Sequence, residues 1–389
     1  MKTIGTFKNK EAASLRIIPV AEDRLMCKFI ELPWSLYTHD ANWVPPLLLE
    51  RKWHLSSQNP YFEHAEFQAW VACRGDRIVG RISAQVDQLH LQRYHDATGF
   101  FGLLEAEDDE ETFHALFETA EGWLRQKGLR RVRGPFNLSI NDECGLLVEG
   151  YDSPPPVMLG HALPYYKLRI EEQGYRKVQD LLAYRVHPEV APPQHLEVLS
   201  RRAAGRVTVR SMRRGHFNED LDIIQDIFED AWSENWGFIP FTPSEFKALG
   251  KNFKLLIDSD SIKIAEVDGE PAAMMVMFPN INEIIKDLNG RLLPLGLLKL
   301  LWRLKVAGVK TARVPLMGVR RRYHGSRMGA TLALMVIAPL HERARKQGIE
   351  EVDMSWVLEQ NQGMRKIIES VGGSLYKRYR IYQKDFSEL

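Results

Sequence analysis

The stretch that decides the fold of this chain is residues 311–382, TARVPLMGVRRRYHGSRMGATLALMVIAPLHERARKQGIEEVDMSWVLEQNQGMRKIIESVGGSLYKRYRIY. Apolar residues recur from Thr311 to Val319, which is typical of a strand, and a turn with glycines follows. Helical spacing of leucine, methionine and valine predicts a helix from about Ala330 to Lys346. A helix that starts directly after a strand presents free N–H groups and a positive dipole end, so this junction is a ready site for phosphate groups.

The second part of the stretch predicts two more strands around a short helix. Gly348 ends the long helix, and the apolar run Val352 to Leu358 predicts the next strand. Asn361 then precedes a short helix, and the strand Tyr376 to Tyr382 is expected to close the unit.

In this order, the elements resemble the CoA-binding half of a GNAT (GCN5-related N-acetyltransferase) acyltransferase. The GNAT loop carries Arg or Gln, two residues, Gly, one residue, then Gly or Ala, and the matching positions here are His324, Arg327 and Gly329. Gly325 lies two residues early. The backbone cradle is expected to survive because it uses N–H groups. Arg327 either contacts a phosphate or blocks the close approach of CoA, and the sequence leaves both readings open.

The resemblance implies an acyl-CoA or acetyl-CoA donor over this junction, and no metal. The residues that it assigns to the donor are Met317, Val319, Arg322, His324, Gly325, Ser326, Arg327, Met328, Gly329, Ala330 and Asn361.

The fold is expected to occur twice. The helix end at residues 125–129, RQKGL, reappears at residues 345–349 as RKQGI, and similar hairpins and closing strands flank both copies. We therefore predict an α/β (α+β) fold of two tandem GNAT-like domains, each a central mixed sheet flanked by helices. The predicted boundaries are 1–190, a proline-containing linker at 191–205, and 206–389.

The first half lacks a usable phosphate loop, because residues 99–105, GFFGLLE, occupy the place where that loop is expected. This predicts a degenerate domain without CoA binding. An extra segment in this half contains Asn141 and Asp142, which either bind polar groups of a substrate or only form turns.

An apolar insert, residues 284–310, distinguishes the second half. Leu297 and Leu301 belong to the wide apolar face of a predicted helix, and Lys299 and Arg303, four residues apart, form a narrow basic stripe beside it. The helix either touches a membrane or lines a lipid pocket, or it is buried between domains. The first reading favours a lipid amine or a long acyl chain as substrate.

Aromatic and acidic residues indicate the acceptor side. In GNAT proteins this side is formed by the first two helices, which implies Trp232, Asn235 and Trp236 as substrate contacts here. The candidates for the general base are Glu283, and second Glu234. The tyrosine that serves as the acid in GNAT enzymes is absent, because Ile368 occupies its position, and Tyr379 is a substitute on the next strand.

Composition restricts the class of protein. A net charge of +1 gives no global attraction to nucleic acid, so no nucleic-acid partner is expected. The three cysteines, Cys27, Cys73 and Cys144, lack a CxxC spacing, which argues against zinc and against a disulfide framework. With neither a signal core nor a transmembrane run, the expected location is the cytoplasm, with peripheral contact at the inner membrane face if the insert meets lipid. The oligomeric state is not predicted.

These features together predict an N-acyltransferase that moves an acyl group from acyl-CoA to an amine. The whole chain resembles tandem GNAT proteins of bacteria, among them ceramide-synthase-like N-acyltransferases that acylate a long-chain amine. Two alternatives remain: a noncatalytic ligand-binding or scaffold protein with eroded sites, and a Fem-like aminoacyl transferase that uses charged tRNA. A dATP pyrophosphohydrolase is rejected because the chain has no Nudix-type box.

Overall fold

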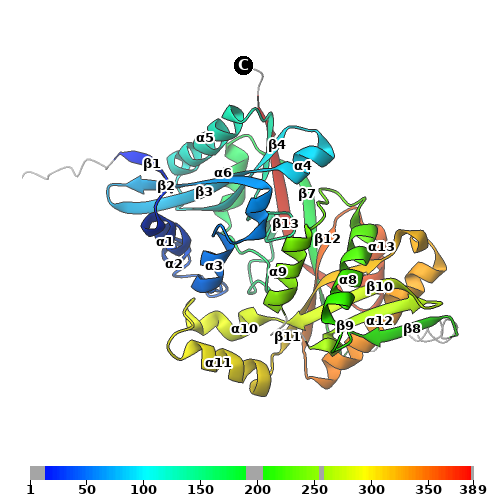
Figure 1. The fold of residues 1–389 in the computed structure, drawn as a ribbon. Coiled ribbons are helices and arrows are strands. Elements are labelled where there is room, and N and C mark those ends of the chain that lie inside the picture. The colour runs from blue at the N-terminus through cyan, green and yellow to red at the C-terminus, as the bar shows by residue number, and fades with distance from the viewer. Residues whose placement is uncertain (1–13, 190–204, 254–257, 387–389) are drawn as a thin grey trace, which may run out of the picture.

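A single mixed sheet runs through both halves of the chain, with helices packed on its faces (Figure 1). The computed structural model describes residues 14–189, 205–253 and 258–386. The predicted linker at 191–205 lies outside the described residues, apart from Gly205.

The first half contains seven strands and six α-helices among its described residues. The strands are β1 (Leu15–Pro19), β2 (Ala65–Arg74), β3 (Arg77–Asp87), β4 (Thr98–Ala106), β5 (Arg131–Gly134), β6 (Leu146–Glu149) and β7 (Arg176–Val186). The helices are α1 (Asp23–Glu31), α2 (Pro33–Leu36), α3 (Leu48–His54), α4 (Gln88–Tyr94), α5 (Glu110–Gln126) and α6 (Tyr165–Glu172), with a short 3-10 turn η1 (Pro60–Glu63).

The second half repeats this order with a different set of connections. Its strands are β8 (Val207–Ser211), β9 (Ile262–Val267), β10 (Glu270–Pro279), β11 (Thr311–Val319), β12 (Glu351–Leu358) and β13 (Ser374–Asp385). Its α-helices are α8 (Phe217–Trp232), α9 (Pro243–Phe253), α10 (Ile281–Ile285), α11 (Gly296–Trp302), α12 (Arg327–Lys346) and α13 (Gln362–Ser370). Short turns are η2 (Ser259–Ser261), η3 (Lys286–Leu288), η4 (Arg303–Ala307) and η5 (Arg321–Tyr323).

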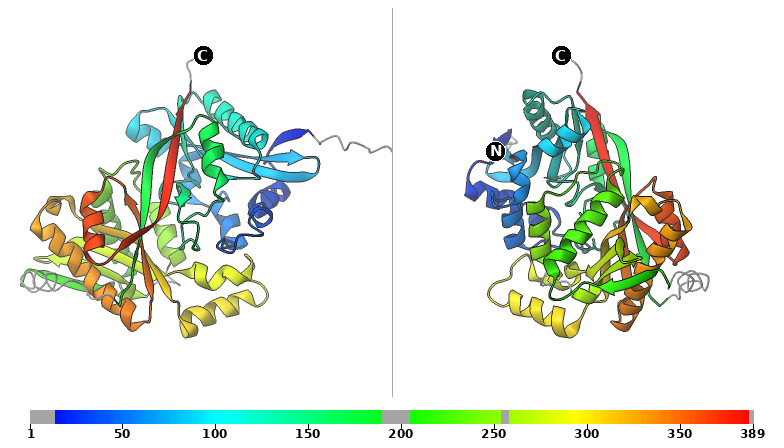
Figure 2. Two further views of the ribbon diagram at one scale, coloured as in Figure 1. Left: turned by 180° about the vertical axis from the view of Figure 1, so that it is seen from behind. Right: turned by 45° about the vertical axis from the view of Figure 1, so that its right-hand side comes forward.

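The two halves exchange their last strands. The order across the sheet is β1-β2-β3-β4-β5-β13-β7-β12-β11-β10-β9-β8, so β13 lies in the first half and β7 pairs with β12 of the second. Figure 2 shows these two long strands side by side at the centre of the molecule. We expected the strand Tyr376 to Tyr382 to close the second-half unit, but its neighbours in the sheet are β5 and β7.

Side-chain burial explains the exchange. Tyr379, Ile381 and Tyr382 of β13 are fully buried in the core of the first half, and Leu182 and Tyr184 of β7 are buried in the core of the second. Each half therefore completes its hydrophobic core with a strand from the other. Because the halves share this central pair of strands, they are held as one unit by backbone hydrogen bonds as well as by packing.

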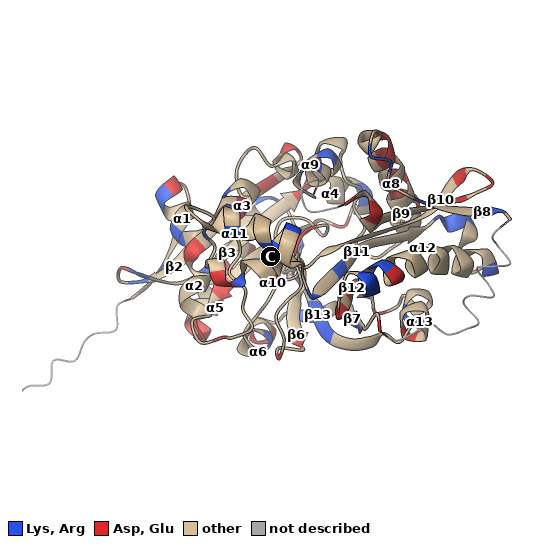
Figure 3. Ribbon diagram, turned by 90° about the horizontal axis from the view of Figure 1, so that it is seen from below, with Lys and Arg blue, Asp and Glu red and all other residues tan. Residues whose placement is uncertain are grey.

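The apolar insert forms a projecting arm of helices α10 and α11 beneath α3 (Figure 1). It is tied to the first half, because Trp34 Nε1 donates to Asn289 Oδ1 at 2.7 Å and the Leu48 amide donates to the carbonyl of Gly290 at 2.9 Å. Basic and acidic residues are interspersed along the helices around it (Figure 3). Within the described part of the chain, no helix is long and apolar enough to cross a membrane.

Candidate active site

Strands β11 and β12 part in the middle of the sheet and create an opening. They pair in parallel from Thr311 and Glu351 as far as Val314 and Met354, and the register stops there. Beyond that point the strands line the two sides of a cavity of about 660 Å³, which we call the loop cavity because the turn before α12 forms its rim. Parting of the strands frees backbone groups that a ligand can bind.

The rim of the loop cavity is the start of α12. Ser326 is the N-cap, and its Oγ accepts a hydrogen bond from the Gly329 amide at 3.1 Å. The amides of Gly325, Arg327 and Met328 have no hydrogen-bond acceptor among the described residues. Unsatisfied amides at the positive end of a 20-residue helix provide an anion-binding site.

Gly329 is required by a close backbone approach. A Cβ atom at this position would lie 2.2 Å from the carbonyl oxygen of Tyr323. We expected that a bulky residue at Gly329 would weaken CoA binding and leave the fold intact. The structure corrects this, because η5 must move before any side chain fits.

Most residues assigned to the donor line the loop cavity. These are Met317, Val319, His324, Gly325, Ser326, Gly329, Ala330 and Asn361. Arg322, Arg327 and Met328 do not line it; Met328 packs against the second-half core instead. Their role toward the donor stays a prediction.

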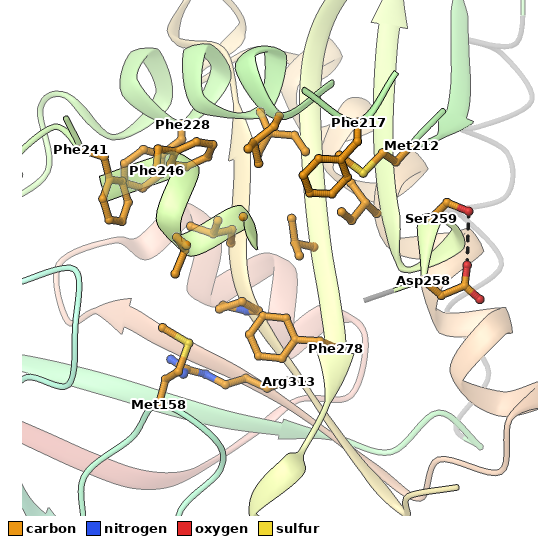
Figure 4. A pocket seen from close by; sticks show the side chains of 18 of the residues that line it. Met158, Met212, Phe217, Phe228, Phe241, Phe246, Asp258, Ser259, Phe278 and Arg313 are labelled. Carbon is orange, nitrogen blue, oxygen red and sulfur yellow. Dashed lines mark hydrogen bonds between the residues drawn. The ribbon is translucent and has the colours of Figure 1, made fainter. Parts of the chain in front are cut away.

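A second cavity, of about 440 Å³, lies beside the first and is mostly apolar (Figure 4). We call it the apolar cavity. Its wall combines β10, β11, α8 and α9, and the residues labelled in Figure 4 include Met158, Met212, Phe228, Phe246 and Phe278. Arg313 is the charged side chain that reaches its lower end in this view.

A third cavity, of about 650 Å³, lies between the two halves and is called here the inter-half cavity. Helix α3 and the loops at 137–143 and 155–161 line it from the first half, and α9 and α10 line it from the second. Leu300 of the apolar insert also lines it.

Shared walls connect the three cavities. Asn141, Trp232 and Trp356 line both the loop cavity and the apolar cavity, whereas Asp142 and Met158 line both the apolar cavity and the inter-half cavity. The predicted pair Asn141 and Asp142 therefore lies where all three spaces meet. Asn141 Nδ2 donates to the carbonyl of Ile239 at 3.1 Å, which ties this first-half loop to the second half.

The aromatic candidates of the acceptor side lie at the loop cavity. Trp232, Asn235 and Trp236 line it, and Trp232 Nε1 donates to the carbonyl of Met317 at 3.1 Å. Glu234 also lines the loop cavity, where its carboxylate accepts a hydrogen bond from Arg321 at 2.5 Å. This ion pair holds Glu234 beside the donor loop.

The other predicted residues lie away from the cavities. Glu283 accepts hydrogen bonds from the amides of Lys310 and Thr311 at 2.9–3.0 Å, so its carboxylate fastens a turn. Tyr379 is fully buried, and its hydroxyl has no partner among the described residues. Leu297 and Leu301 are each 43% exposed on the outer surface. The roles assigned to these four residues remain predictions.

Comparisons with known proteins identify relatives of the whole chain. No protein-family model matches the chain. The chain is 48% identical over 357 residues to protein YghO of Escherichia coli K12, covering 92% of each. It is 45% identical over 379 residues to the bacterial ceramide synthase of Caulobacter vibrioides, covering 96% of this chain and 98% of the relative.

Solved structures give the same fold. A tandem GNAT protein from the clavulanic acid biosynthesis pathway superposes with a TM-score of 0.56 at 13% identity, covering 97% of this chain and 100% of that protein. A GCN5-related N-acetyltransferase from Sphaerobacter thermophilus superposes with a TM-score of 0.51 at 12% identity, over 96% and 98%. The chain belongs to the family of the bacterial ceramide synthase, and its fold is that of tandem GNAT proteins. It is a GNAT-type acyltransferase with two tandem domains.

Acyl-CoA or acetyl-CoA is the general donor of GNAT enzymes, and the second half of this GNAT protein has the free amides for it. The first half does not. Its junction between β4 and α5 is Glu107 to Asp109, and the N-cap Asp109 accepts from the Thr112 amide at 2.9 Å. We expected the loop at residues 99–105, but those residues belong to β4, buried in the sheet. The described residues contain no cluster of His, Cys, Asp or Glu placed to hold a metal ion.

Sequence reasoning missed three residues of this GNAT site. Arg313, Trp356 and His54 each line one or two of the cavities. Arg313 could have been found in the sequence, because it is a charged residue in the middle of an apolar strand. In the structure it is 3% exposed and donates to the carbonyls of Val157 and Ser355. No sequence pattern indicates His54, since only the fold brings α3 close to Asp142.

Proposed function

We propose that this GNAT protein transfers a long acyl chain from acyl-CoA to the nitrogen of a lipid amine. The observation that carries the proposal is the apolar cavity, which opens beside the loop cavity through a shared wall of Asn141, Trp232 and Trp356. A donor whose phosphates bind the α12 amides has its thioester between the parted strands. Its chain then has an apolar space of ligand size to enter.

Chain length follows from burial. Each methylene group removed from water contributes about 0.8 kcal/mol, so a chain of several carbons in the apolar cavity binds far more tightly than an acetyl group. The inter-half cavity is left for the acceptor. Its wall carries both apolar and ionisable side chains, as an amine with a long tail requires.

The relative from Caulobacter vibrioides supports this substrate class. Its name denotes a synthase of ceramide, which is the amide of a fatty acid and a long-chain amino alcohol. The alignment covers 96% of this chain and 98% of the relative, so the similarity extends over both halves.

We also propose that the insert is a membrane contact. Leu293, Leu295, Leu298, Trp302 and Val306 are 58–73% exposed. Several large exposed apolar side chains within one short segment are a feature of interaction sites. Residues 286–310 contain six basic residues and one acidic residue, whereas the whole chain has a net charge of +1. A basic surface with leucine and tryptophan fits an anionic bilayer.

Donor-length selectivity tests the proposed function. Leu221 is partly buried and lines the apolar cavity, so Leu221→Trp is expected to fill part of that space. Transfer from palmitoyl-CoA to sphinganine should fall at least tenfold while binding of CoA itself is unchanged. Leu168→Trp, at a 56% exposed leucine on α6, is the matched control and should have no effect.

The opposite result is equally clear. Faster transfer by the wild type from acetyl-CoA than from palmitoyl-CoA would exclude a long-chain donor. Formation of no amide from any acyl-CoA would exclude the proposed reaction and favour either a binding protein or an aminoacyl transferase.

A further inference from the structure

One wall of the inter-half cavity comes from the first half and carries ionisable side chains that the donor site does not use. His54, the last residue of α3, lies on this wall with Tyr61 and Asp142. His54 is only 7% exposed, and its carbonyl accepts a hydrogen bond from Asn59 Nδ2 at 2.7 Å. This hydrogen bond fixes the backbone at the end of α3, from which the imidazole extends.

Asp142 faces the imidazole. Its Oδ1 lies 3.7 Å from His54 Nε2, and its Oδ2 accepts from the Ser139 amide at 3.1 Å. A carboxylate fixed by its own loop in this way orients an imidazole and favours one tautomer. With a proton on Nε2 directed at Asp142, the lone pair of His54 lies on Nδ1.

Unsatisfied polar atoms gather on the same wall. His54 Nδ1, Tyr61 Oη and Arg81 Nε are buried and have no hydrogen-bond partner among the described residues. A buried polar group without a hydrogen-bond partner is destabilising. Three such groups around one cavity indicate that polar groups of a ligand, or water that it displaces, bind there.

The position of Asp142 relates this wall to the transfer point. Asn141 lines the loop and apolar cavities, and the next residue, Asp142, lines the apolar and inter-half cavities. A thioester at Asn141 therefore lies one residue along the chain from the carboxylate that contacts His54. An acceptor that enters from the inter-half cavity passes His54 before it reaches the thioester.

We propose that His54 is the general base of the reaction and that Asp142 is the residue that positions its imidazole. The inference rests on the proposed N-acyl transfer. The half of the molecule that lacks a donor site then supplies the group that activates the acceptor.

The proton and electron balance is complete without a metal or a redox partner. The lone pair of the neutral amine forms the N–C bond to the thioester carbon, and the carbonyl electrons move onto oxygen. His54 Nδ1 takes one proton from the nitrogen. The C–S bond breaks as the carbonyl re-forms, CoA leaves as a thiolate that takes a proton from solvent, and His54 returns its proton to solvent.

The charges around His54 suit a base that works near neutral pH. Burial lowers the pKa of His54, and the nearby carboxylate of Asp142 more than offsets this, so that the net pKa lies above its ordinary value. Glu50 acts in the same direction and Arg51 opposes it, both from α3. Glu143, from the loop of Asp142, faces the group as well but is paired with Arg51.

The test uses palmitoyl-CoA and sphinganine with the full chain. The amide product is measured by mass spectrometry, and the released thiol of CoA is measured by a colorimetric thiol assay. We expect His54→Gln to lower kcat/KM at least 100-fold, the usual size of general-base catalysis. Asp142→Asn should lower it less and move the acidic limb of the pH profile to lower pH. Tyr61→Phe is the matched control at the same wall; it should leave the position of that limb unchanged.

The outcomes separate the base from the reaction. A folded His54→Gln variant within threefold of the wild type, or an unmoved limb in Asp142→Asn, would overturn the assignment while the proposed function stands. If the wild type forms no amide, the proposed function fails. In that case, titration of His54 by NMR tests whether Asp142 acts on its imidazole. Asp142→Asn must lower the pKa of His54, and an unchanged pKa overturns the pairing. Melting temperatures within a few degrees of the wild type establish that each variant is folded.

Discussion

The two strand-to-helix junctions of this molecule have the same place in the fold and opposite electrostatics. In the second half, β11 leads through Arg320, Arg321 and Arg322 to the Ser326 cap of α12. In the first half, β4 leads through Glu107 and Asp108 to an aspartate cap on α5. A helix dipole attracts anions at both. The Asp109 carboxylate already caps the first junction, so we predict that a phosphate binds at the second.

The segments inserted in the two halves also differ, in this case in the direction in which they extend from the sheet. The first-half loop around Asn141 and Asp142 is drawn inward, to the meeting point of the three cavities. The second-half insert points outward and leaves leucines and Trp302 exposed. In our proposal the two halves of the duplicated fold have different roles: the second half binds the donor and carries the apolar arm, and the first half supplies groups that act on the acceptor.

The strongest test of the difference between the junctions is a paired substitution. Ala330→Trp places a large ring in the first turn of α12, where Ala330 is exposed and lines the loop cavity. We expect CoA affinity, measured by calorimetry, to fall at least tenfold, which is about 1.4 kcal/mol. Glu110→Trp is the matched change in the first turn of α5 and should leave affinity and a stoichiometry of one CoA per chain unchanged.

Two results would break the comparison. Two CoA molecules bound per wild-type chain would show that the acidic junction is also a donor site. Full affinity in a folded Ala330→Trp variant would remove the donor from α12.

The outward insert gives a second, smaller effect. The double change Leu298→Ser with Trp302→Ser removes two side chains that are 66% and 58% exposed. Sedimentation with phosphatidylglycerol vesicles should show at least a fivefold loss of binding, and the melting temperature should change little because exposed positions contribute little to stability. Leu168→Ser on α6 is the control. Equal vesicle binding by all three proteins would leave the arm without a membrane role.

The smallest expected effect is a pH-dependent link between the halves. His64 Nδ1 lies 3.2 Å from Asp87 and Nε2 lies 3.1 Å from Glu245 in the first turn of α9. Burial opposes its charge, but the two carboxylates raise the pKa of His64 to about 9. A raised pKa in the folded state means that the stabilisation is complete below about pH 6.5 and is lost as pH rises through about 9.

We therefore expect the melting temperature of the wild type to fall between pH 6.5 and 9.5 by roughly 2 °C more than that of His64→Gln, measured by calorimetry. His114→Gln, at an exposed histidine on α5, should follow the wild type. Parallel curves for the wild type and His64→Gln would show that this link does not contribute to stability.

The local pattern of apolar and capping residues was sufficient to predict helices and strands in both halves. The predicted strand Thr311 to Val319 has the bounds of β11, and a hairpin precedes the long helix in each half, as expected. The helix expected from Ala330 begins at Arg327 instead, because the Ser326 side chain caps it earlier. Periodicity and caps are properties of neighbouring residues, so they can be recognised in a single sequence.

The sequence by itself determined the duplicated GNAT-like fold and located the loop before α12 and the apolar insert, whereas the donor role of that loop stays a prediction. Only the tertiary structure decided the exchange of β7 and β13, the meeting of three cavities at Asn141 and Asp142, and the approach of His54 to Asp142. The physical reason is the separation in sequence over which each interaction acts. Backbone geometry and amphipathic spacing act over a few residues, whereas strand exchange and the His54–Asp142 contact depend on which apolar faces bury one another across 88 or more residues of chain.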